Sequence, residues 1–160
     1  MPELIAPAEA YRESYCEALH ELQDEWRHVG SCPERLPVHH DASGEIPRTT
    51  WWLVDGDEYI GTAWMRHVTP DRLLDAGGHI GYEIRPSKRG CGYGKLILKL
   101  MLEKAREAGD SSVVLLCNED NPASMKIIEA NGGVLVGERA TDRKKGAVRH
   151  FVYLIEMSQQ

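Results

Sequence analysis

The chain has 160 residues, a formal net charge of −6, 42% hydrophobic residues and 28% charged residues. This length fits one domain over residues 1–160 with a buried core, and the composition is too apolar for a disordered chain. The acidic balance argues against nucleic acid or an anionic membrane as the partner, because both require a basic field on the protein. No apolar run approaches the ~20 residues that span a bilayer, and no basic stretch followed by an apolar one opens the chain, so we expect a cytoplasmic protein.

The N-terminal part combines one helix with a long irregular stretch. Apolar residues recur at helical spacing over 7–26, which predicts an amphipathic helix. Residues 28–48 carry five Gly or Pro residues and no clear period, so we expect a loop there, with one helical turn around 33–36. Long loops in compact domains are often functional, and we expect His39-His40 to act as a lid.

A hairpin and a third strand follow. Residues 49–54 are rich in β-branched and aromatic side chains, and Asp55-Gly56 predicts a tight turn whose two central residues both have positive φ. The chain returns over 58–67, where Gly61 predicts a bulge. Polar and apolar residues then alternate over 79–85, as expected for a half-buried strand.

The C-terminal half alternates helices with strands. A helix is predicted from the glycine-rich loop to about Ala108, followed by a buried strand over 112–117. Asn121-Pro122 begins the next helix, with Asn as N-cap and Pro at the first position. Two strands, about 134–139 and 148–157, complete the chain. The order of elements predicts an α/β (α+β) fold with a mixed central sheet and flanking helices.

The four cysteines are scattered and form no Cys-x-x-Cys pair, so we expect packed or idle thiols. They are Cys16, Cys32, Cys91 and Cys117. His39, His40 and Asp41 follow Cys32, but their spacing matches no zinc pattern. No metal is therefore expected.

The most informative segment lies between the third strand and the next helix. It reads Arg89-Gly90-Cys91-Gly92-Tyr93-Gly94-Lys95. Glycines let the backbone turn tightly and let a ligand approach exposed N–H groups, and the first turn of a helix attracts phosphates. Arg89 and Lys95 add positive charge. The alternative is an ordinary strand-to-helix turn that uses glycine.

Two familiar phosphate loops do not fit this segment. A P-loop needs four residues between its first glycine and Gly-Lys-Ser/Thr, whereas Gly90 and Gly94 leave three, and Leu96 follows the lysine. The dinucleotide pattern Gly-x-Gly-x-x-Gly is also absent. Both mismatches argue against nucleotide hydrolysis and nicotinamide chemistry.

Arg89-x-x-Gly92-x-Gly94 resembles the Arg/Gln-x-x-Gly-x-Gly/Ala signature of the GNAT N-acetyltransferase superfamily, which cradles the pyrophosphate of coenzyme A. Residues 77–86 and 121–133 resemble a largely uncharacterised bacterial acetyltransferase branch, and the resemblance extends over about 47–155. It implies a single acyl-CoA N-acyltransferase domain with acetyl-CoA as co-substrate and a sheet splayed at the cofactor site.

The resemblance also implies where the cofactor binds. The glycine loop would hold the pyrophosphate, and pantetheine would pair with backbone at Ile84 and along 114–117. Asn121 and Ser124, at the start of the following helix, would lie beside the pantetheine arm. Backbone N–H groups near 83–84 would polarise the thioester carbonyl.

Catalysis in this superfamily proceeds by direct attack of an amine, which must first lose a proton. Glu83 and His79 are the candidate bases, because their spacing along one strand places both on the same face. Glu83 could instead pair with Arg85 or Arg66, and His79 could hold a turn. The tyrosine that many members use as acid is replaced by Ile128. Ser124, Tyr153 or water could replace that acid, or the thiolate could leave unaided, because the pKa of a thiol is only ~8.5.

The acceptor side is less well defined. The resemblance places Arg66, His67, Trp52 and His150 at the acceptor cavity, where Arg66 would bind a carboxylate or phosphate. Arg66 could equally be an ion-paired strand residue, and Trp52 a core residue.

We expect transfer of an acetyl group to a small-molecule amine. The alternatives are a protein acetyltransferase that acts on lysine or an N-terminus, and a non-catalytic coenzyme A sensor. Members of the superfamily often form dimers, which makes a homodimer an expectation here too.

Overall fold

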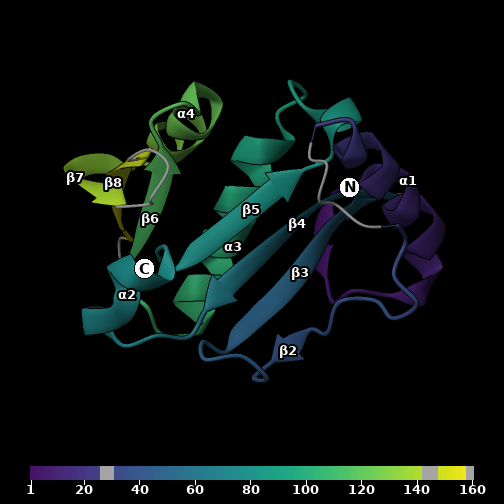
Figure 1. Ribbon diagram of the computed structural model, residues 1–160, viewed down its shortest axis with the longest axis horizontal. Helices are drawn as coiled ribbons and strands as arrows, with labels where there is room; N and C mark the ends of the chain where they lie inside the picture. The colour runs from purple at the N-terminus through teal and green to yellow at the C-terminus, as the bar shows by residue number, and fades with distance from the viewer. Residues whose placement is uncertain (26–30, 142–147, 158–160) are drawn as a thin grey trace.

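The computed structural model describes residues 1–25, 31–141 and 148–157 (Figure 1). The α-helices are α1 (Arg12–Gln23), α2 (Leu73–Ala76), α3 (Tyr93–Glu107) and α4 (Pro122–Ala130). The strands are β1 (Glu3–Ile5), β2 (His40–Asp41), β3 (Arg48–Asp55), β4 (Glu58–Arg66), β5 (Ile80–Ile84), β6 (Ser112–Asn118), β7 (Val134–Thr141) and β8 (Val148–Glu156). Short 3-10 turns occupy Glu9–Tyr11, Pro70–Arg72 and Pro86–Lys88.

The strands form two antiparallel sheets that diverge from one another. The first has the order β1-β3-β4-β5, with β2 on β3, and the second has the order β6-β8-β7. Figure 1 shows β5 and β6 pointing the same way and separating along their length. The α/β fold is confirmed, and the mixed sheet expected from the sequence is divided into two ladders by this gap.

The two sheets touch where the gap begins. The backbone N–H of His79 donates to the Val114 carbonyl over 2.8 Å, and the N–H of Val114 donates to His79 Nδ1 over 2.9 Å. Gly78 forms an isolated bridge with Leu115 and has φ +89°. A Cβ at Gly78 would lie 2.8 Å from the Val114 carbonyl oxygen, so only glycine permits both this approach and this backbone angle.

One hydrophobic core joins both sheets. Side chains of α3 that recur at helical spacing, such as Ile97 and Met101, are fully buried against it. Leu53 of the first sheet and Val113 of the second belong to the same cluster. Helix α3 therefore holds the sheets together behind the gap, as Figure 1 shows.

Helix α1 covers the other face of the first sheet and anchors the end of β5. Trp52 is fully buried there and stacks on Tyr15 with ring centroids 4.5 Å apart. Arg85 is 6% exposed and forms an ion pair with Glu21 of α1 over 2.6 Å. Hydrogen bonds from Arg85 and Ser87 lower the pKa of Glu21 to about 2. This pair fixes the chain just before the glycine loop.

The hairpin and loop predictions need small corrections. The turn between β3 and β4 consists of Gly56 and Asp57, one residue later than predicted, and only Gly56 has positive φ. That sign pattern belongs to a type II′ turn, which needs glycine at its first central position alone. The register shift in β4 leaves Ile60 as the extra residue, so the bulge lies beside Gly61.

Two expectations for the N-terminal part are wrong. Residues 33–36 form no helical turn, and the described part of the 28–48 loop instead contributes strand β2. Cys16 and Cys32 are joined as a disulfide, with Cα atoms 5.0 Å apart, whereas sequence spacing suggested isolated thiols. The pairing arises because the chain returns to α1 after the helix ends, which spacing alone does not reveal. Cys91 and Cys117 are free.

None of the described helices is long and apolar enough to cross a membrane.

Candidate active site

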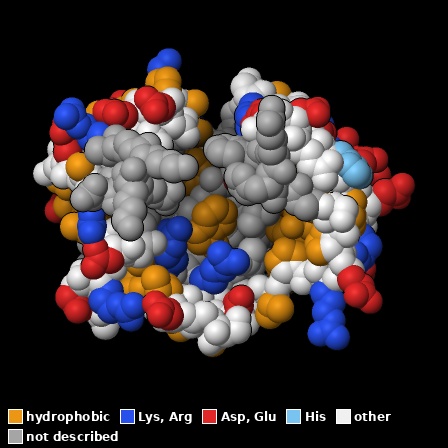
Figure 2. All heavy atoms as spheres, viewed as in Figure 1, with side chains coloured by type: hydrophobic (Ala, Val, Ile, Leu, Met, Phe, Trp, Pro, Cys, Tyr) orange, Lys and Arg blue, Asp and Glu red, His pale blue; other side chains and the backbone are white. Residues whose placement is uncertain are grey.

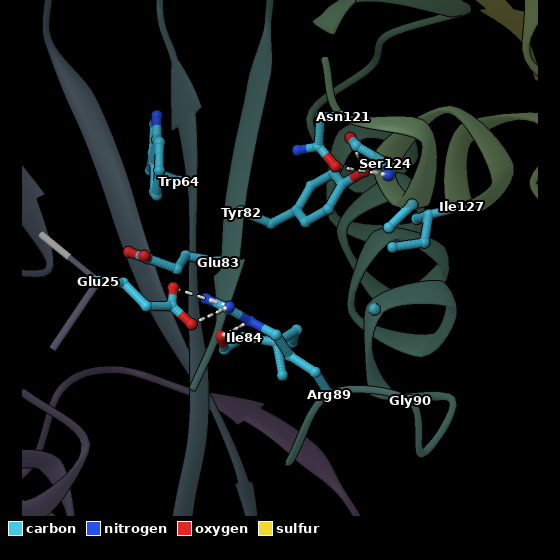
Figure 3. A pocket seen from close by; sticks show the side chains of 12 residues that line it. Glu25, Trp64, Tyr82, Glu83, Ile84, Arg89, Gly90, Asn121, Ser124 and Ile127 are labelled. Atoms are coloured by element: carbon cyan, nitrogen blue, oxygen red, sulfur yellow. Dashed lines mark hydrogen bonds and ion pairs between the residues drawn. The ribbon is translucent and has the colours of Figure 1, made fainter. Parts of the chain in front are cut away.

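A cavity of about 480 Å³ opens between β5 and the first turns of α3 and α4 (Figure 3). Its lining combines charged, polar and apolar side chains from both sides of the gap. The lining residues are Glu25, Trp64, Tyr82, Glu83, Ile84, Arg89, Gly90, Gly94, Asn121, Ala123, Ser124 and Ile127. Six of the ten residues predicted to bind the cofactor are among them, whereas Cys91, Gly92, Tyr93 and Lys95 are not.

The glycine loop forms the N-terminal end of α3. Gly90 has φ +73° and Gly92, the N-cap residue, has φ +86°, so both adopt the left-handed conformation. No heavy atom lies within 4 Å of a Cβ built at either glycine, which leaves their backbone accessible. The first N–H groups of the 15-residue helix have no partner within the helix and carry partial positive charge. This end of α3 is therefore suited to a phosphate group.

The other loop residues contribute in different ways. Lys95 lies exposed in the first turn of α3. The Tyr93 hydroxyl donates to Asp55 over 2.8 Å and so ties the helix to β3. Cys91 is exposed, and Gly94 faces Ile127, 2.5 Å from where a Cβ would stand. Neither Tyr93 nor Cys91 lines the cavity.

Arg89 spans the cavity wall between the loop and β5. Its Nε donates to the Ile84 carbonyl over 3.1 Å, and its Nη1 lies 2.7 Å and 2.8 Å from the carboxylate oxygens of Glu25. Figure 3 shows this ion pair beside Ile84, among the residues that line the cavity. A phosphate that uses Arg89 must therefore compete with the Glu25 carboxylate.

The edge of β5 that faces the gap has no ladder partner among the described strands, so its backbone N–H groups are available to a ligand. The Arg66 N–H donates to the His79 carbonyl and the Arg85 N–H donates to the Ile60 carbonyl, so within β5 the backbone groups of the odd-numbered residues point toward β4. Alternate residues of a strand direct their backbone groups to opposite edges. The N–H groups of Tyr82 and Ile84 consequently point toward the gap, which agrees with the role predicted for Ile84.

Two side chains bridge the gap from β5 to α4. The Tyr82 hydroxyl and the Ser124 hydroxyl are 2.8 Å apart, and Figure 3 shows the tyrosine ring reaching across to the helix. Asn121 caps α4 by accepting a hydrogen bond from the Ser124 N–H over 3.1 Å, as predicted. Burial raises the pKa of Tyr82 to about 12, so its hydroxyl stays protonated at neutral pH.

Glu83 extends from β5 into the same cavity, close to Trp64 (Figure 3). It forms no salt bridge with any residue that the structure describes, because Arg85 is paired with Glu21 and Arg66 reaches other acceptors. Burial raises the pKa of Glu83, Arg89 opposes that shift and Glu25 adds to it. A partly buried carboxyl with a raised pKa is suited to accepting a proton near neutral pH.

His79 lies at the start of the gap and lines neither of the two cavities described here. Its Nδ1 lone pair accepts the N–H of Val114, and burial lowers the pKa of the imidazole while Asp110 opposes the shift. The neutral ring therefore carries its proton on Nε2. This geometry supports the alternative considered for His79, that of a residue which holds a turn.

A second cavity of about 220 Å³ adjoins the first. The two share Trp64, Tyr82, Asn121 and Ser124, so the Tyr82–Ser124 contact marks their junction. Arg66 also lines the second cavity. The Trp64 ring lies over Gly81, where any Cβ would collide with the indole. Glycine at this position thus makes room for the tryptophan between the two cavities.

The other residues predicted for acceptor binding lie outside both cavities. Trp52 is a core residue under α1. His67 is exposed, with Nε2 2.8 Å from the Thr49 hydroxyl, and His150 pairs with Asn118 within the second sheet. Arg66 alone of the four predicted residues reaches the cavity.

Three residues that matter to this site have only weak sequence signals. Trp64 lies two residues before Arg66, on the same face of β4, and could have been found from that alternation. Tyr82 lies on the apolar side of its strand and reads as a core residue. Glu25 lies just beyond α1, far from the loop in sequence.

Tyr153, weighed as an acid, is buried and donates to Glu129 instead.

The histidines of the N-terminal loop are held by β3. His39 Nδ1 donates to the Thr50 carbonyl over 2.7 Å, and His40 Nδ1 lies 3.1 Å from the Thr49 hydroxyl. Neither lines a cavity described here, so the lid expectation finds no support.

Across the described residues, no group of three or more His, Cys, Asp or Glu side chains could hold a metal ion.

The chain matches the acetyltransferase (GNAT) domain family over residues 6–134. It therefore belongs to this family, which defines the protein as an acetyl-CoA-dependent acetyltransferase by class. The resemblance based on the glycine loop is thereby confirmed. No curated protein gives a significant match.

Solved structures share the fold at low sequence identity. RimL, a ribosomal L7/L12 alpha-N-protein acetyltransferase in complex with coenzyme A, is 17% identical, with a TM-score of 0.69 over 98% of this chain and 94% of that one. The Microcin C7 self-immunity acetyltransferase MccE, in complex with acetyl-CoA and AMP, is 14% identical, with a TM-score of 0.72 over 98% and 92%. A chimera of the Vibrio cholerae spermidine N-acetyltransferase SpeG and hSSAT is 13% identical, with a TM-score of 0.64 over 97% and 95%.

The Glu25–Arg89 pair predicts opposite effects of two matched neutral substitutions on acetyl-CoA affinity. Glu25→Gln frees Arg89 and removes a negative charge from the cavity mouth, so the Kd should fall about two- to fivefold, the range expected for an exposed ion pair. Arg89→Gln removes the cation and should raise the Kd about tenfold. Isothermal titration calorimetry measures both. Weaker binding in Glu25→Gln would show that the pair supports the site rather than competing with the ligand.

Proposed function

We propose that the protein transfers the acetyl group of acetyl-CoA to the amine of a small-molecule acceptor by direct attack. The observation that carries this proposal is the composition of the main cavity. A helix N-terminus, an unpaired strand edge and a partly buried carboxyl without an ion-pair partner among the described residues all face it. The enzyme class follows from the family, and the kind of acceptor is the part that we propose.

The residues present fit coenzyme A from one end of the cavity to the other. The glycine loop with Arg89 and Lys95 suits the pyrophosphate. The open edge of β5 offers backbone groups to the amide-containing pantetheine arm, opposite Asn121 and Ser124. When bound, the cofactor supplies the activated acetyl group as a thioester.

Glu83 acts as the general base. Its carboxylate accepts a proton from the ammonium form of the acceptor, directly or through water, so that the nitrogen lone pair can form the new N–C bond. The N–H groups of Tyr82 and Ile84 stabilise the negative charge that develops on the thioester oxygen. No step needs a protein nucleophile: burial raises the pKa of the Cys117 thiol, and Cys91 is exposed in the loop.

Tyr82 takes the place of the acid that is missing at Ile128. The attacking nitrogen forms the N–C bond and loses its second proton to solvent as the C–S bond breaks. The leaving sulfur takes one proton from its donor, which regains a proton from solvent. The Tyr82 hydroxyl lies at the junction of the two cavities and is hydrogen-bonded to Ser124, so it can donate its proton there. Its raised pKa keeps that proton available throughout the neutral range. Ile128, by contrast, is buried in the core.

A small acceptor is supported by the size of the second cavity. Its volume of about 220 Å³ suits a compact molecule. Its lining comes from the α2–β5 connection, from strands β4, β5 and β6, and from helix α4 with its N-cap residue. A protein N-terminus is the second candidate, because RimL, which shares the fold, acts on a ribosomal protein.

The cytoplasmic location, the single domain over 1–160 and the homodimer remain predictions.

The function and the base are tested together by a pH profile of amine acetylation. Wild-type enzyme should acetylate members of an amine pool, detected by mass spectrometry and coenzyme A release. Its kcat/KM should fall as the pH drops through the pKa of Glu83, which burial places above the usual glutamate value. Above that pKa the rate should level off, because the enzyme removes the ammonium proton itself.

Glu83→Gln should lower kcat/KM at neutral pH about 100-fold and change the shape of the profile. Without the base, only free amine reacts, so the rate should rise with pH up to the amine pKa near ~10. Acetyl-CoA affinity should stay unchanged as a control. Parallel pH profiles of wild type and variant would exclude Glu83 as the base.

Tyr82→Phe keeps the aromatic ring but removes the hydroxyl group and with it the proton for the leaving sulfur. We expect kcat to fall about tenfold or more with an unchanged Kd for acetyl-CoA, because the loss concerns the leaving group only. Ser124→Ala is the matched control, since it removes the hydrogen-bond partner and leaves the Tyr82 proton in place. Stopped-flow detection of coenzyme A release measures kcat. Equal losses in both variants, or none in Tyr82→Phe, would contradict the assignment.

A further inference from the structure

The second cavity contains a guanidinium group without a carboxylate partner. Arg66 is partly buried, and burial lowers its pKa, with a further contribution from Arg48. Guanidinium groups nevertheless stay protonated in proteins. No carboxylate of the described residues lies within ion-pair distance of Arg66, although the chain has 25 acidic residues. A partly buried charge of this kind normally has a partner.

The positions of the guanidinium nitrogens leave hydrogen-bonding capacity for a ligand. Arg66 Nη1 donates to the carbonyls of Gly77 and Gly78, over 3.2 Å each. A guanidinium has five N–H donors, so three remain, and none of them meets an acceptor among the described residues. The carbon at the centre of the guanidinium lies 5.8 Å from the centroid of the Trp64 ring. These contacts fix the group in place and leave its free donors for one further acceptor group.

The cavity around Arg66 leads to the reacting centre. It shares Trp64, Tyr82, Asn121 and Ser124 with the cofactor cavity. Figure 2 shows the molecule from the side seen in Figure 1, where Lys and Arg side chains lie beside hydrophobic ones in the hollow between the two halves. A molecule in the second cavity thus lies between a cation and the site proposed for acetyl transfer.

Strand register sets the spacing between Arg66 and the base. Both residues lie on the same face of the first sheet, and Glu83 pairs with Thr62, four residues before Arg66 on β4. At roughly 3.3 Å per residue, the two strand positions are about 13 Å apart. Trp64 lies midway between them and provides an apolar wall. This spacing suits a short molecule with an anionic group at one end and an amine at the other.

We propose that the acceptor is an amine that carries an anionic oxygen group, a carboxylate or a phosphonate, which Arg66 binds. The inference rests on the proposed N-acetyltransferase function and narrows its substrate class. Arg66 holds the anionic group at the Gly77–Gly78 end of the cavity, and the amine extends along Trp64 toward Glu83. The same cation disfavours polyamines, because a second positive charge would be placed beside the guanidinium.

The test compares acceptors that differ only in the anionic group. Amino carboxylic acids of increasing chain length are assayed beside n-alkylamines of the same length and beside aminoalkylphosphonates. With wild-type enzyme, KM for the best acid or phosphonate should be about tenfold or more below that of its matched alkylamine, because the anionic group then forms an ion pair with Arg66. The group with the lower KM identifies which anion is bound.

Arg66→Gln should raise KM for the acid relative to KM for the alkylamine, so that the ratio of the alkylamine KM to the acid KM falls from about ten or more to about one. Arg66→Lys keeps the charge and should retain part of the discrimination. The ratio within one variant does not depend on how much of that variant is folded, which matters because Arg66 also supports Gly77 and Gly78.

Three outcomes would overturn the inference. If wild-type enzyme has the same KM for alkylamines and for the matched acids, Arg66 has no role in acceptor recognition. The same conclusion follows if Arg66→Gln leaves the ratio of these two KM values unaltered. If wild-type enzyme binds acetyl-CoA but acetylates no amine of any charge, the proposed function itself fails and the narrower inference fails with it. The two failures are distinguished by whether any acetylated product forms.

Discussion

The contact between Gly78-His79 and Val114-Leu115 determines the shape of the site. It joins the two sheets at one end, and beyond it β5 and β6 separate (Figure 1). Separation leaves one backbone edge of β5 without a ladder partner, which would normally be a liability in a sheet. Here that edge faces a cavity closed by α3 and α4. The positive φ of Gly78 and the use of His79 Nδ1 as an acceptor both serve this contact.

Charge is arranged in order along the space that this contact creates. Arg89 lies at the mouth, paired with Glu25, Glu83 lies in the middle, and Arg66 lies in the adjoining cavity. The protein as a whole is acidic, with a net charge of −6, yet it places cations at both ends of the proposed reaction path. With an anionic cofactor bound at one end and an anionic acceptor group at the other, the Glu83 carboxylate between them would accept the proton of the acceptor ammonium.

The parts of the site formed by consecutive residues could be predicted from the sequence. The glycine loop and the Asn121 cap depend on local backbone conformation, and the structure gives both the expected geometry. Of the two bases proposed from strand alternation, Glu83 lines the cavity and His79 does not. The acyltransferase class followed from the loop motif, and the family match confirms it.

The remaining features depend on contacts between distant segments. Trp52 and Trp64 both lie in strands of the first sheet, but α1 buries the first, whereas the second lines the cavity. His79 is committed to Val114, 35 residues away, and Glu25 reaches Arg89 across 64 residues. Tyr82 reads as an apolar strand residue until α4 provides Ser124 as its partner. No short-range pattern carries this information.

Hydrogen–deuterium exchange with and without acetyl-CoA tests the central claim most directly. The account predicts slower amide exchange in two separate segments, 80–85 on the open edge of β5 and 90–96 at the start of α3. The edge strand β7 at 134–136, which is exposed and remote from the cavity lining, should be unaffected. Saturable binding without protection of both segments would contradict a cofactor site between the diverging sheets.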